Sequence, residues 1–140
     1  MAQLKIEIIT PKKVAYKGDI VSATIPGTIG SFQILVGHAP VVSTFGIGAI
    51  RLELDKDEKK YFATGGGTVE VLNNNIRILA DSLEAVENVD VERANKAFKR
   101  AKERLEEKSS RKTDVERAKA ALERAKNRIE LAEKYSVAGK

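Results

Sequence analysis

The spacing of apolar residues changes near residue 85, and this change constrains the fold more than any other feature of the chain. Before it, apolar residues alternate with polar ones in steps of two, which places one set on the buried face of a β-strand. After it, small and apolar residues recur in steps of three and four, the spacing of one face of an α-helix. We therefore predict a β domain at residues 1–85 and a helical domain at residues 86–140.

The first 85 residues carry the pattern of a small antiparallel sheet protein. Strand segments follow one another every eight to twelve residues, and turn signals separate them. These signals include Gly18-Asp19, Gly37-His38-Ala39-Pro40 and Asn73-Asn74-Asn75, the last because Asn tolerates positive φ. This rhythm is typical of an antiparallel β-sandwich or barrel.

No catalytic constellation is visible in the sequence. His38 is the only histidine, and no serine or cysteine nucleophile is evident beside it. Gly65-Gly66-Gly67 lacks the Lys-Ser/Thr of a phosphate loop, so we expect a bulge or a close approach of backbone segments there. Cysteine is absent, which excludes disulfides and thiolate metal sites. We therefore predict a protein that is not an enzyme, ligates no metal and requires no cofactor.

Two helices are predicted within residues 86–140. The apolar seam of the first consists of Val91, Ala94, Phe98, Ala101 and Leu105. The seam of the second consists of Val115, Ala118, Leu122, Ala125, Ile129 and Ala132. The short connection around Ser109-Ser110 favours an antiparallel hairpin. Because each alanine buries far less than a Leu or Ile worth ~1.5–3 kcal/mol, we expect a weakly held hairpin that can move.

The positive charge of the chain lies in the predicted helices. Residues 86–140 hold 16 of the 25 Lys and Arg residues but 11 of the 20 Asp and Glu residues, so the first 85 residues are neutral. Three arginines share one face of each helix: Arg93, Arg100 and Arg104 on the first, and Arg117, Arg124 and Arg128 on the second. Such rows suit phosphate or carboxylate groups, and the alternative is a solvated face with i,i+4 ion pairs such as Glu130 with Lys126.

A basic hairpin also admits a nucleic-acid-binding module as an alternative function. The sequence pI of about 9.4 is compatible with it. The mixture of 11 acidic with 16 basic residues makes a poor counterion-releasing surface, and with no Trp, three Tyr and four Phe there are few stacking platforms. We therefore expect no nucleic acid partner.

The chain carries no sign of membrane insertion or export. Its first residues lack the layout of a signal peptide, and no run reaches the roughly 18–20 apolar residues of a membrane span. We expect a soluble protein in the cytoplasm.

Four segments of the chain together resemble one known protein family. Residues 4–11 (LKIEIITP) are similar to the opening strand of that family. Residues 30–40 resemble its Gly-x-x-x-(Ile/Val)-Leu-Pro-Gly-His-x-Pro loop, with Val36 in the place of the first Pro. Residues 65–71 resemble its Gly-Gly-Phe-x-Glu-Val stretch, with Gly67 where an aromatic residue is usual, and residues 117–129 resemble its second helix. The family is the epsilon subunit of bacterial F-type ATP synthase.

The resemblance implies an α+β fold, in which an N-terminal antiparallel β-sandwich precedes a C-terminal two-helix antiparallel hairpin. It implies that the sandwich docks on the rotor of the proton-driven synthase, with the gamma subunit and the c-ring as partners. Ser31, Phe32 and His38 are expected at this interface. The expected location is peripheral, at the cytoplasmic face of the bacterial inner membrane.

The resemblance also implies that the hairpin is a regulatory switch. Folded against the sandwich, it permits ATP hydrolysis. Extended along the stalk into the catalytic head of alpha and beta subunits, it blocks rotation. An acidic loop of the beta subunits would complement the arginine rows.

In some members of that family the folded hairpin binds ATP through an Ile/Leu-Asp-x-x-Arg-Ala motif and arginines of the second helix. This chain has VDVERA at residues 89–94, which departs from the motif only at its first position. The residues carried over by the resemblance are Glu84, Asp90, Arg93, Arg124 and Arg128. ATP is thus an expected regulatory ligand. The alternative is that Asp90 is the N-cap of the first helix and Arg93 its solvated neighbour.

Overall fold

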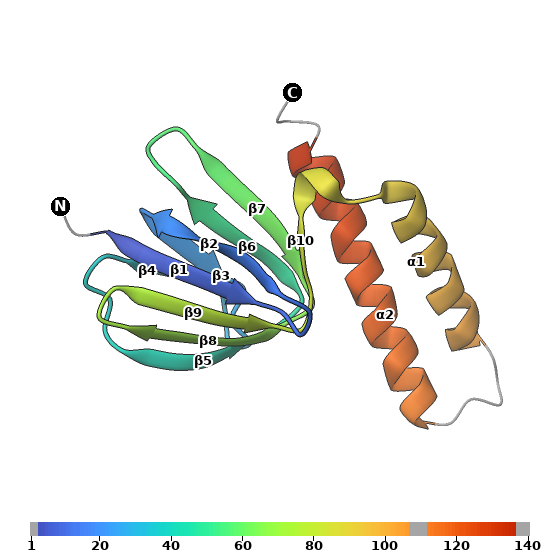
Figure 1. The fold of residues 1–140 in the computed structure, drawn as a ribbon. Helices are drawn as coiled ribbons and strands as arrows, with labels where there is room; N and C mark the ends of the chain where they lie inside the picture. The colour runs from blue at the N-terminus through green and yellow to red at the C-terminus, as the bar shows by residue number, and fades with distance from the viewer. Residues whose placement is uncertain (1–2, 107–111, 137–140) are drawn as a thin grey trace. The chain divides into compact units, whose positions relative to one another are not determined.

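The computed structural model describes residues 3–106 and 112–136, and the chain divides into two compact units, Met1–Ala85 and Val86–Lys140 (Figure 1). Among the described residues, the strands lie in the first unit and the long helices lie in the second. The predicted α+β class, a β-sandwich followed by two helices, is confirmed.

The first unit is a sandwich of two five-stranded sheets. The first sheet has the order β2 (Val14–Ile20), β1 (Leu4–Ile9), β9 (Asn75–Ala80), β8 (Gly67–Leu72) and β5 (Val41–Phe45). The second has the order β10 (Leu83–Ala85), β7 (Lys59–Thr64), β6 (Gly48–Glu53), β3 (Ser22–Ile25) and β4 (Phe32–Leu35). The chain passes from one sheet to the other several times, so neither sheet is built from one continuous segment.

The hydrophobic core lies between the two sheets. Strict alternation along the strands supplies it, as in β9, where Ile76, Ile78 and Ala80 are buried and the residues between them are exposed. The core also contains Leu4, Ile6, Ile8, Ile20, Ala23, Ile25, Ile34, Phe45, Ile50, Leu52, Phe62, Val69 and Val71. Tyr16 of the first sheet meets Phe62 of the second edge to face, with 5.6 Å between ring centroids. The sandwich therefore has a core of large aliphatic and aromatic side chains.

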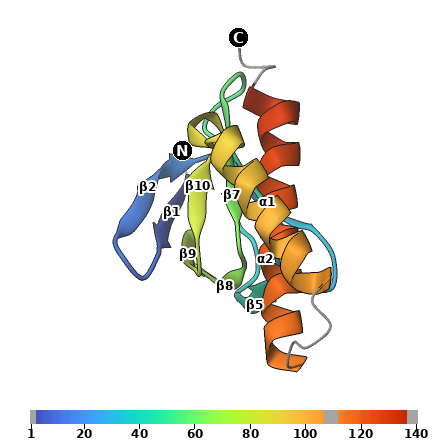
Figure 2. The ribbon, with the colours of Figure 1, turned by 90° about the vertical axis from the view of Figure 1, so that its right-hand side faces the viewer.

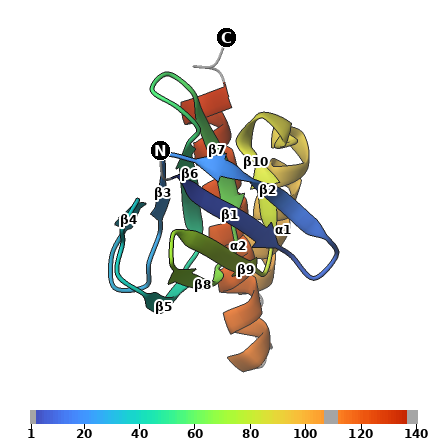
Figure 3. The ribbon, with the colours of Figure 1, turned by 60° about the vertical axis from the view of Figure 1, so that its left-hand side comes forward.

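One strand pair departs from the antiparallel prediction. β1 pairs with β9 in parallel, from Lys5 opposite Asn75 to Ile9 opposite Leu79, and Figure 3 shows β1 between β2 and β9. The other pairs of named strands in the described sandwich are antiparallel. β9 thus lies between β1 and β8, parallel to the first and antiparallel to the second.

The predicted turn at Gly18-Asp19 is wrong. Both residues lie inside β2, with Gly18 opposite Ile6 and Asp19 opposite Lys5. β2 is an edge strand, so Gly18 pairs with one neighbouring strand only, β1. The ring of Tyr16 covers the space above Gly18, since a Cβ there would lie 3.6 Å from the Tyr16 hydroxyl.

The three consecutive glycines form a corner where the chain leaves the second sheet for the first. Gly66 has φ +109°, and a Cβ on Gly67 would overlap the carbonyl oxygen of Leu79. The returning segment runs alongside, because the Asp81 N–H donates to the Gly66 carbonyl at 2.8 Å. The expected close approach of backbone segments is confirmed. Gly67 therefore has no room for a side chain.

The second unit is a helical hairpin, with one short turn before the first helix and another after the second helix. It comprises η1 (Val86–Asn88), α1 (Val91–Glu106), α2 (Lys112–Leu131) and η2 (Ala132–Ser136), the last a π-helical turn. α1 and α2 pack against each other (Figure 2), and their buried residues, with that of η2, are Ala94, Ala101, Ala118, Ala125 and Ala132. Phe98, Leu105, Leu122 and Ile129 are half-buried. Alanines therefore form the centre of the seam, as predicted.

Val91 was expected to begin the seam of α1, and this prediction is wrong. Its side chain is 38% exposed, whereas Val86, just before the helix, is 2% exposed. The end of the seam is closed by η1, which packs against η2, and not by the first residue of α1.

Candidate functional site

Asp90 is the N-cap of α1. Its carboxylate oxygen Oδ1 accepts a hydrogen bond from the Arg93 backbone N–H at 3.0 Å, and its carbonyl accepts from Ala94 N–H at 2.9 Å. A side-chain oxygen that accepts from the third helical N–H is the usual N-cap geometry. The capping role of Asp90 is confirmed, and through it Asp90 fixes the backbone from which the Arg93 side chain projects.

Substitution of Asp90 separates capping from charge. Asp90→Ala should destabilise the helical unit by ~1 kcal/mol, whereas Asp90→Asn should preserve the cap because Asn is an equally good N-cap residue. Thermal unfolding of the helical signal by circular dichroism measures the difference. Equal loss in both variants would show that the negative charge matters and the cap does not.

The six arginines lie on one side of the hairpin, which we call the basic face: Arg93, Arg100, Arg104, Arg117, Arg124 and Arg128. Measured around the helix axis at 3.6 residues per turn, the three arginines of each helix lie about 80–120° from a buried alanine, in the same rotational direction on both helices. The reference alanine is Ala94 in α1 and Ala118 in α2. In an antiparallel pair with facing seams, the same rotational side of both helices points the same way. The two predicted rows therefore form one surface.

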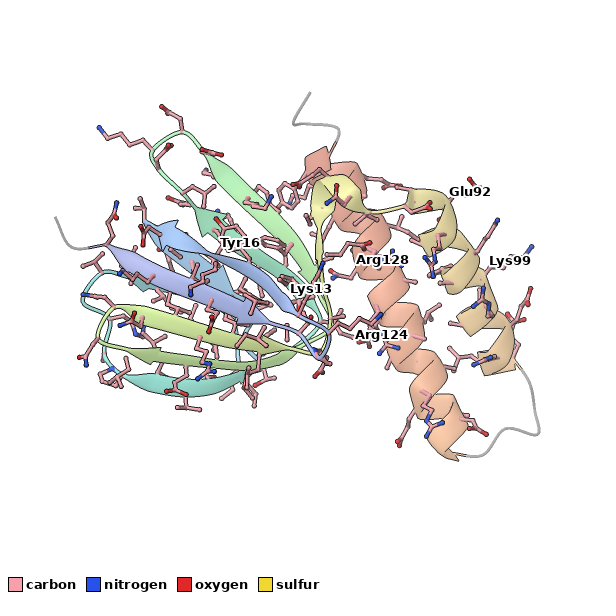
Figure 4. The ribbon with its side chains drawn as sticks, viewed as in Figure 1. Lys13, Tyr16, Glu92, Lys99, Arg124 and Arg128 are labelled. Atoms are coloured by element: carbon pink, nitrogen blue, oxygen red, sulfur yellow. The ribbon has the colours of Figure 1, made fainter. Side chains whose placement is uncertain are left out.

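The remaining charged groups of the helices lie mostly elsewhere. Figure 4 shows Arg124 and Arg128 one turn apart on one side of α2, and Glu92 and Lys99 on α1 away from α2. Ion pairs of the i,i+4 type join Glu92 to Lys96 at 3.7 Å and Glu130 to Lys126 at 4.0 Å. The second of these was predicted. These two ion pairs lie outside the basic face.

The predicted nucleotide residues fall in both units. Asp90, Arg93, Arg124 and Arg128 belong to the hairpin, where Arg93, Arg124 and Arg128 share the basic face. Glu84 belongs to the sandwich, on β10 opposite Ala63 of β7, and is half-buried. The hairpin thus brings three of the five side chains to one side, with Asp90 at the helix start beside Arg93.

The residues predicted for the rotor interface lie at the two ends of edge strand β4. Ser31 and Phe32 are at its start, and His38 is in the loop beyond its end. Two backbone N–H groups of that loop form hydrogen bonds: His38 N–H donates to the Leu35 carbonyl at 3.0 Å, and Gly37 N–H donates to the side-chain oxygen Oδ1 of Asn74 at 2.7 Å. The structure therefore does not bring Phe32 and His38 together. It joins the His38 loop to the β8–β9 turn.

Exposed apolar residues surround the His38 loop and were missed from the sequence. Leu35 and Val36 precede it and are 51% and 44% exposed, while Val42 follows it on β5 and is 75% exposed. Leu72, at the end of β8 beside the turn that holds Gly37, is 50% exposed. We call these four residues the loop patch; Figure 3 shows that β4 and β5 lie along one edge of the sandwich. Their signal was an apolar residue at the outward position of an alternating strand.

Two kinds of site are not found in the described part of the chain. Among residues 3–106 and 112–136, no three acidic or histidine side chains gather closely enough to hold a metal ion. The helices of the same residues are too short or too polar to span a membrane.

Comparison with known families matches the chain in two adjoining parts. Residues 3–86 match the beta-sandwich domain of the ATP synthase delta/epsilon chain. Residues 87–133 match the long alpha-helix domain of the same chain.

Curated relatives are ATP synthase epsilon chains. The chain is 36% identical to that of Salinibacter ruber over 113 residues, which cover 75% of this chain and 76% of the relative. It is 41% identical to that of Desulforamulus reducens, covering 76% and 80% of the two chains. It is 45% identical to that of Leptospira interrogans, covering 64% and 70%.

Solved structures share the fold. A chain of the Euglena gracilis mitochondrial ATP synthase superposes with a TM-score of 0.78 at 20% identity, covering 91% of this chain and 79% of that one. A chain of the Tetrahymena thermophila mitochondrial ATP synthase central stalk and c-ring superposes with a TM-score of 0.58 at 17% identity, covering 96% and 97%. Taken with the matched domains and relatives, the two units and their order show that the chain belongs to the ATP synthase delta/epsilon chain family and is not one of the catalytic subunits of that complex.

Proposed function

We propose that this chain is a rotor subunit of a proton-driven ATP synthase, in which the sandwich couples the central stalk to the c-ring and the hairpin restrains ATP hydrolysis. The observation that carries this proposal is the difference between the two cores. The sandwich buries large side chains such as Ile50, Leu52 and Phe62, whereas the centre of the hairpin seam is alanine. The sandwich is thus a well-packed domain, and it is joined to a helical hairpin whose packing buries little apolar area.

The sandwich offers a surface for docking on a protein partner. The loop patch is apolar and lies beside His38, in a loop that Gly37 fixes to Asn74. Ordered apolar surface of this kind is typical of protein interaction sites. We propose the gamma subunit and the c-ring as its partners, with Ser31 and Phe32 at the other end of β4. The chain would then lie at the cytoplasmic face of the bacterial inner membrane, attached through the complex.

The hairpin supplies the regulation in this proposal. Its weak seam permits release, and its basic face would meet acidic surface in the catalytic head of alpha and beta subunits when the helices extend. An electrostatic contact of this kind loses strength as ionic strength rises. Comparing ATP hydrolysis by complexes that carry the whole chain with complexes that carry residues 1–85 alone tests the proposal.

The basic face also supports ATP as a regulatory ligand of the folded hairpin. Arg93, Arg124 and Arg128 present guanidinium groups, which suit the triphosphate. Asp90 acts in this proposal through the cap that orients the start of α1. Glu84, on β10 of the sandwich, stays a prediction from the family resemblance. A nucleic-acid-binding module, the alternative from sequence, stays a prediction that no structural observation favours.

Arg93→Ala should weaken ATP binding by about tenfold or more, because a charge-assisted hydrogen bond is worth roughly 1.5–3 kcal/mol. Lys99→Ala is the matched control, since Lys99 lies on the same helix away from α2 (Figure 4). Calorimetric titration of ATP into the three proteins measures the affinities. Equal affinities for all three, or no heat with the wild type at millimolar ATP, would rule the site out.

A further inference from the structure

Val86 differs from every other buried residue of the helical unit. Among the described residues of that unit, six side chains are buried, and five of them are alanines: Ala94, Ala101, Ala118, Ala125 and Ala132. Val86 is the sixth, at 2% exposed. Within the described part of the hairpin unit, the largest fully buried side chain therefore lies outside both long helices, in the turn that precedes them.

The partner of this turn is the C-terminal end of the second helix. η1 packs against η2, and Figure 1 shows the short turn after β10 lying against the last turns of α2. η2 is a π-helical turn, a wider and rarer geometry than the α-helix and one often found at functional positions. Ala132, its first residue, is 4% exposed. A departure from α-helical geometry thus coincides with the contact to η1.

The contact between η1 and η2 lies at the end of the hairpin where the start of α1 and the end of α2 are not joined by a connecting segment. At the other end, α1 and α2 are joined through residues 107–111. Here they have no covalent link, and the alanine seam supplies little apolar area to hold them. The η1 turn closes with a hydrogen bond from Val89 N–H to the Val86 carbonyl at 3.2 Å, and Asp90 then caps α1. Val86 is thus tied through a short ordered turn to the start of α1.

We propose that Val86 and η2 form a latch that holds the hairpin closed, and that opening of the hairpin begins when η2 leaves Val86. Val86 directly follows Ala85, the last residue of β10, so in sequence the latch begins where the helical unit begins. Release of η2 frees both the end of α2 and the turn that leads into α1. The effect of the latch on hydrolysis rests on the proposed function, while its effect on the hairpin is a property of the chain alone.

Hydrogen exchange of the full chain tests the latch directly. In Val86→Ala, amides near the end of α2 and the start of α1 should exchange about tenfold faster, because removing buried methyl groups favours local opening. Val91→Ala is the matched control: it removes the same two methyl groups from an exposed residue of the neighbouring helix start, and it should leave these rates unchanged. Equal acceleration in both variants, or acceleration spread evenly over the strands of the sandwich, would overturn the proposal.

Removal of residues 132–140 gives a second, independent arm. If η2 is the partner of Val86, the shortened chain should exchange faster at the same amides, and Val86→Ala should add little in that background because the contact is already lost. An undiminished effect of Val86→Ala in the shortened chain would overturn the latch. Hydrolysis measured with the same variants addresses the proposed function separately: faster exchange with unchanged hydrolysis would preserve the latch and count against the regulatory role.

Discussion

A complex reconstituted with residues 1–85 is expected to hydrolyse ATP about fivefold faster or more than a complex carrying the whole chain, if the hairpin supplies a coupling free energy in the usual ~1–3 kcal/mol range. The truncation ends after β10, so it retains every strand of the described sandwich. The core cluster of the sandwich consists of residues from that unit alone. The shortened chain should therefore fold and still bind the gamma subunit.

Three measurements separate the outcomes of this truncation. Circular dichroism and thermal unfolding establish that the sandwich is folded, a pull-down establishes that it binds gamma, and hydrolysis rates at low and high ATP report the inhibition. Folded, gamma-bound chain with unchanged hydrolysis at both ATP concentrations would remove the hairpin from regulation. A chain that fails to bind gamma would instead place part of the docking surface beyond residue 85.

The second large effect is expected at the glycine corner. Gly67→Ala should destabilise the sandwich by about 3 kcal/mol, the upper end of the usual penalty for forcing atoms into a packed region. The reason is steric, because the new Cβ would overlap the carbonyl oxygen of Leu79, and backbone moves less easily than a side chain. Leu79 and its neighbour Ala80 belong to β9, so relief of the clash requires displacement of a central strand.

Gly46→Ala is the matched control for this substitution. Gly46 is also a loop glycine of the sandwich, but a Cβ there would meet nothing within 4 Å. Its substitution should change stability by less than about 1 kcal/mol, and the lower entropy of the unfolded chain favours a small gain. Chemical denaturation of both variants measures the difference. Similar unfolding midpoints would show that the corner relaxes to accommodate a side chain.

Local periodicity predicted the elements of the fold, but not all of their partners. Apolar residues recur in steps of two along residues 75–80 and in steps of three and four after Val91. Both patterns depend only on which face of the element is buried, so both could be recognised in the sequence. The parallel pairing of β1 with β9 was not, because it joins segments about seventy residues apart and leaves no mark on either. Gly18 misled for a related reason: it lies within β2 opposite Ile6, and this pairing with a distant residue leaves no mark on the Gly18-Asp19 pair itself.

The candidate sites divide in the same way. The arginine rows followed from helical spacing, and the N-cap of Asp90 followed from its residue type just before a helix. The apolar residues of the loop patch could be recognised one by one in the sequence, but their gathering around one loop could not, because it depends on the contact of Gly37 with Asn74. Val86 was missed because it lies outside both helical repeats, in a turn whose contact with η2 joins segments about fifty residues apart.

The position of β1 also bears on the order in which the chain acquires its structure. β1 is the first strand to be synthesised, and its sheet is incomplete until β9, at Asn75–Ala80, is available to pair with it. Closing such a distant contact is slow compared with forming a helical hairpin, whose two halves are separated by a short connection. The helices follow the sandwich in the chain and pack against each other, so the hairpin can form without waiting for the distant pairing of β1 with β9.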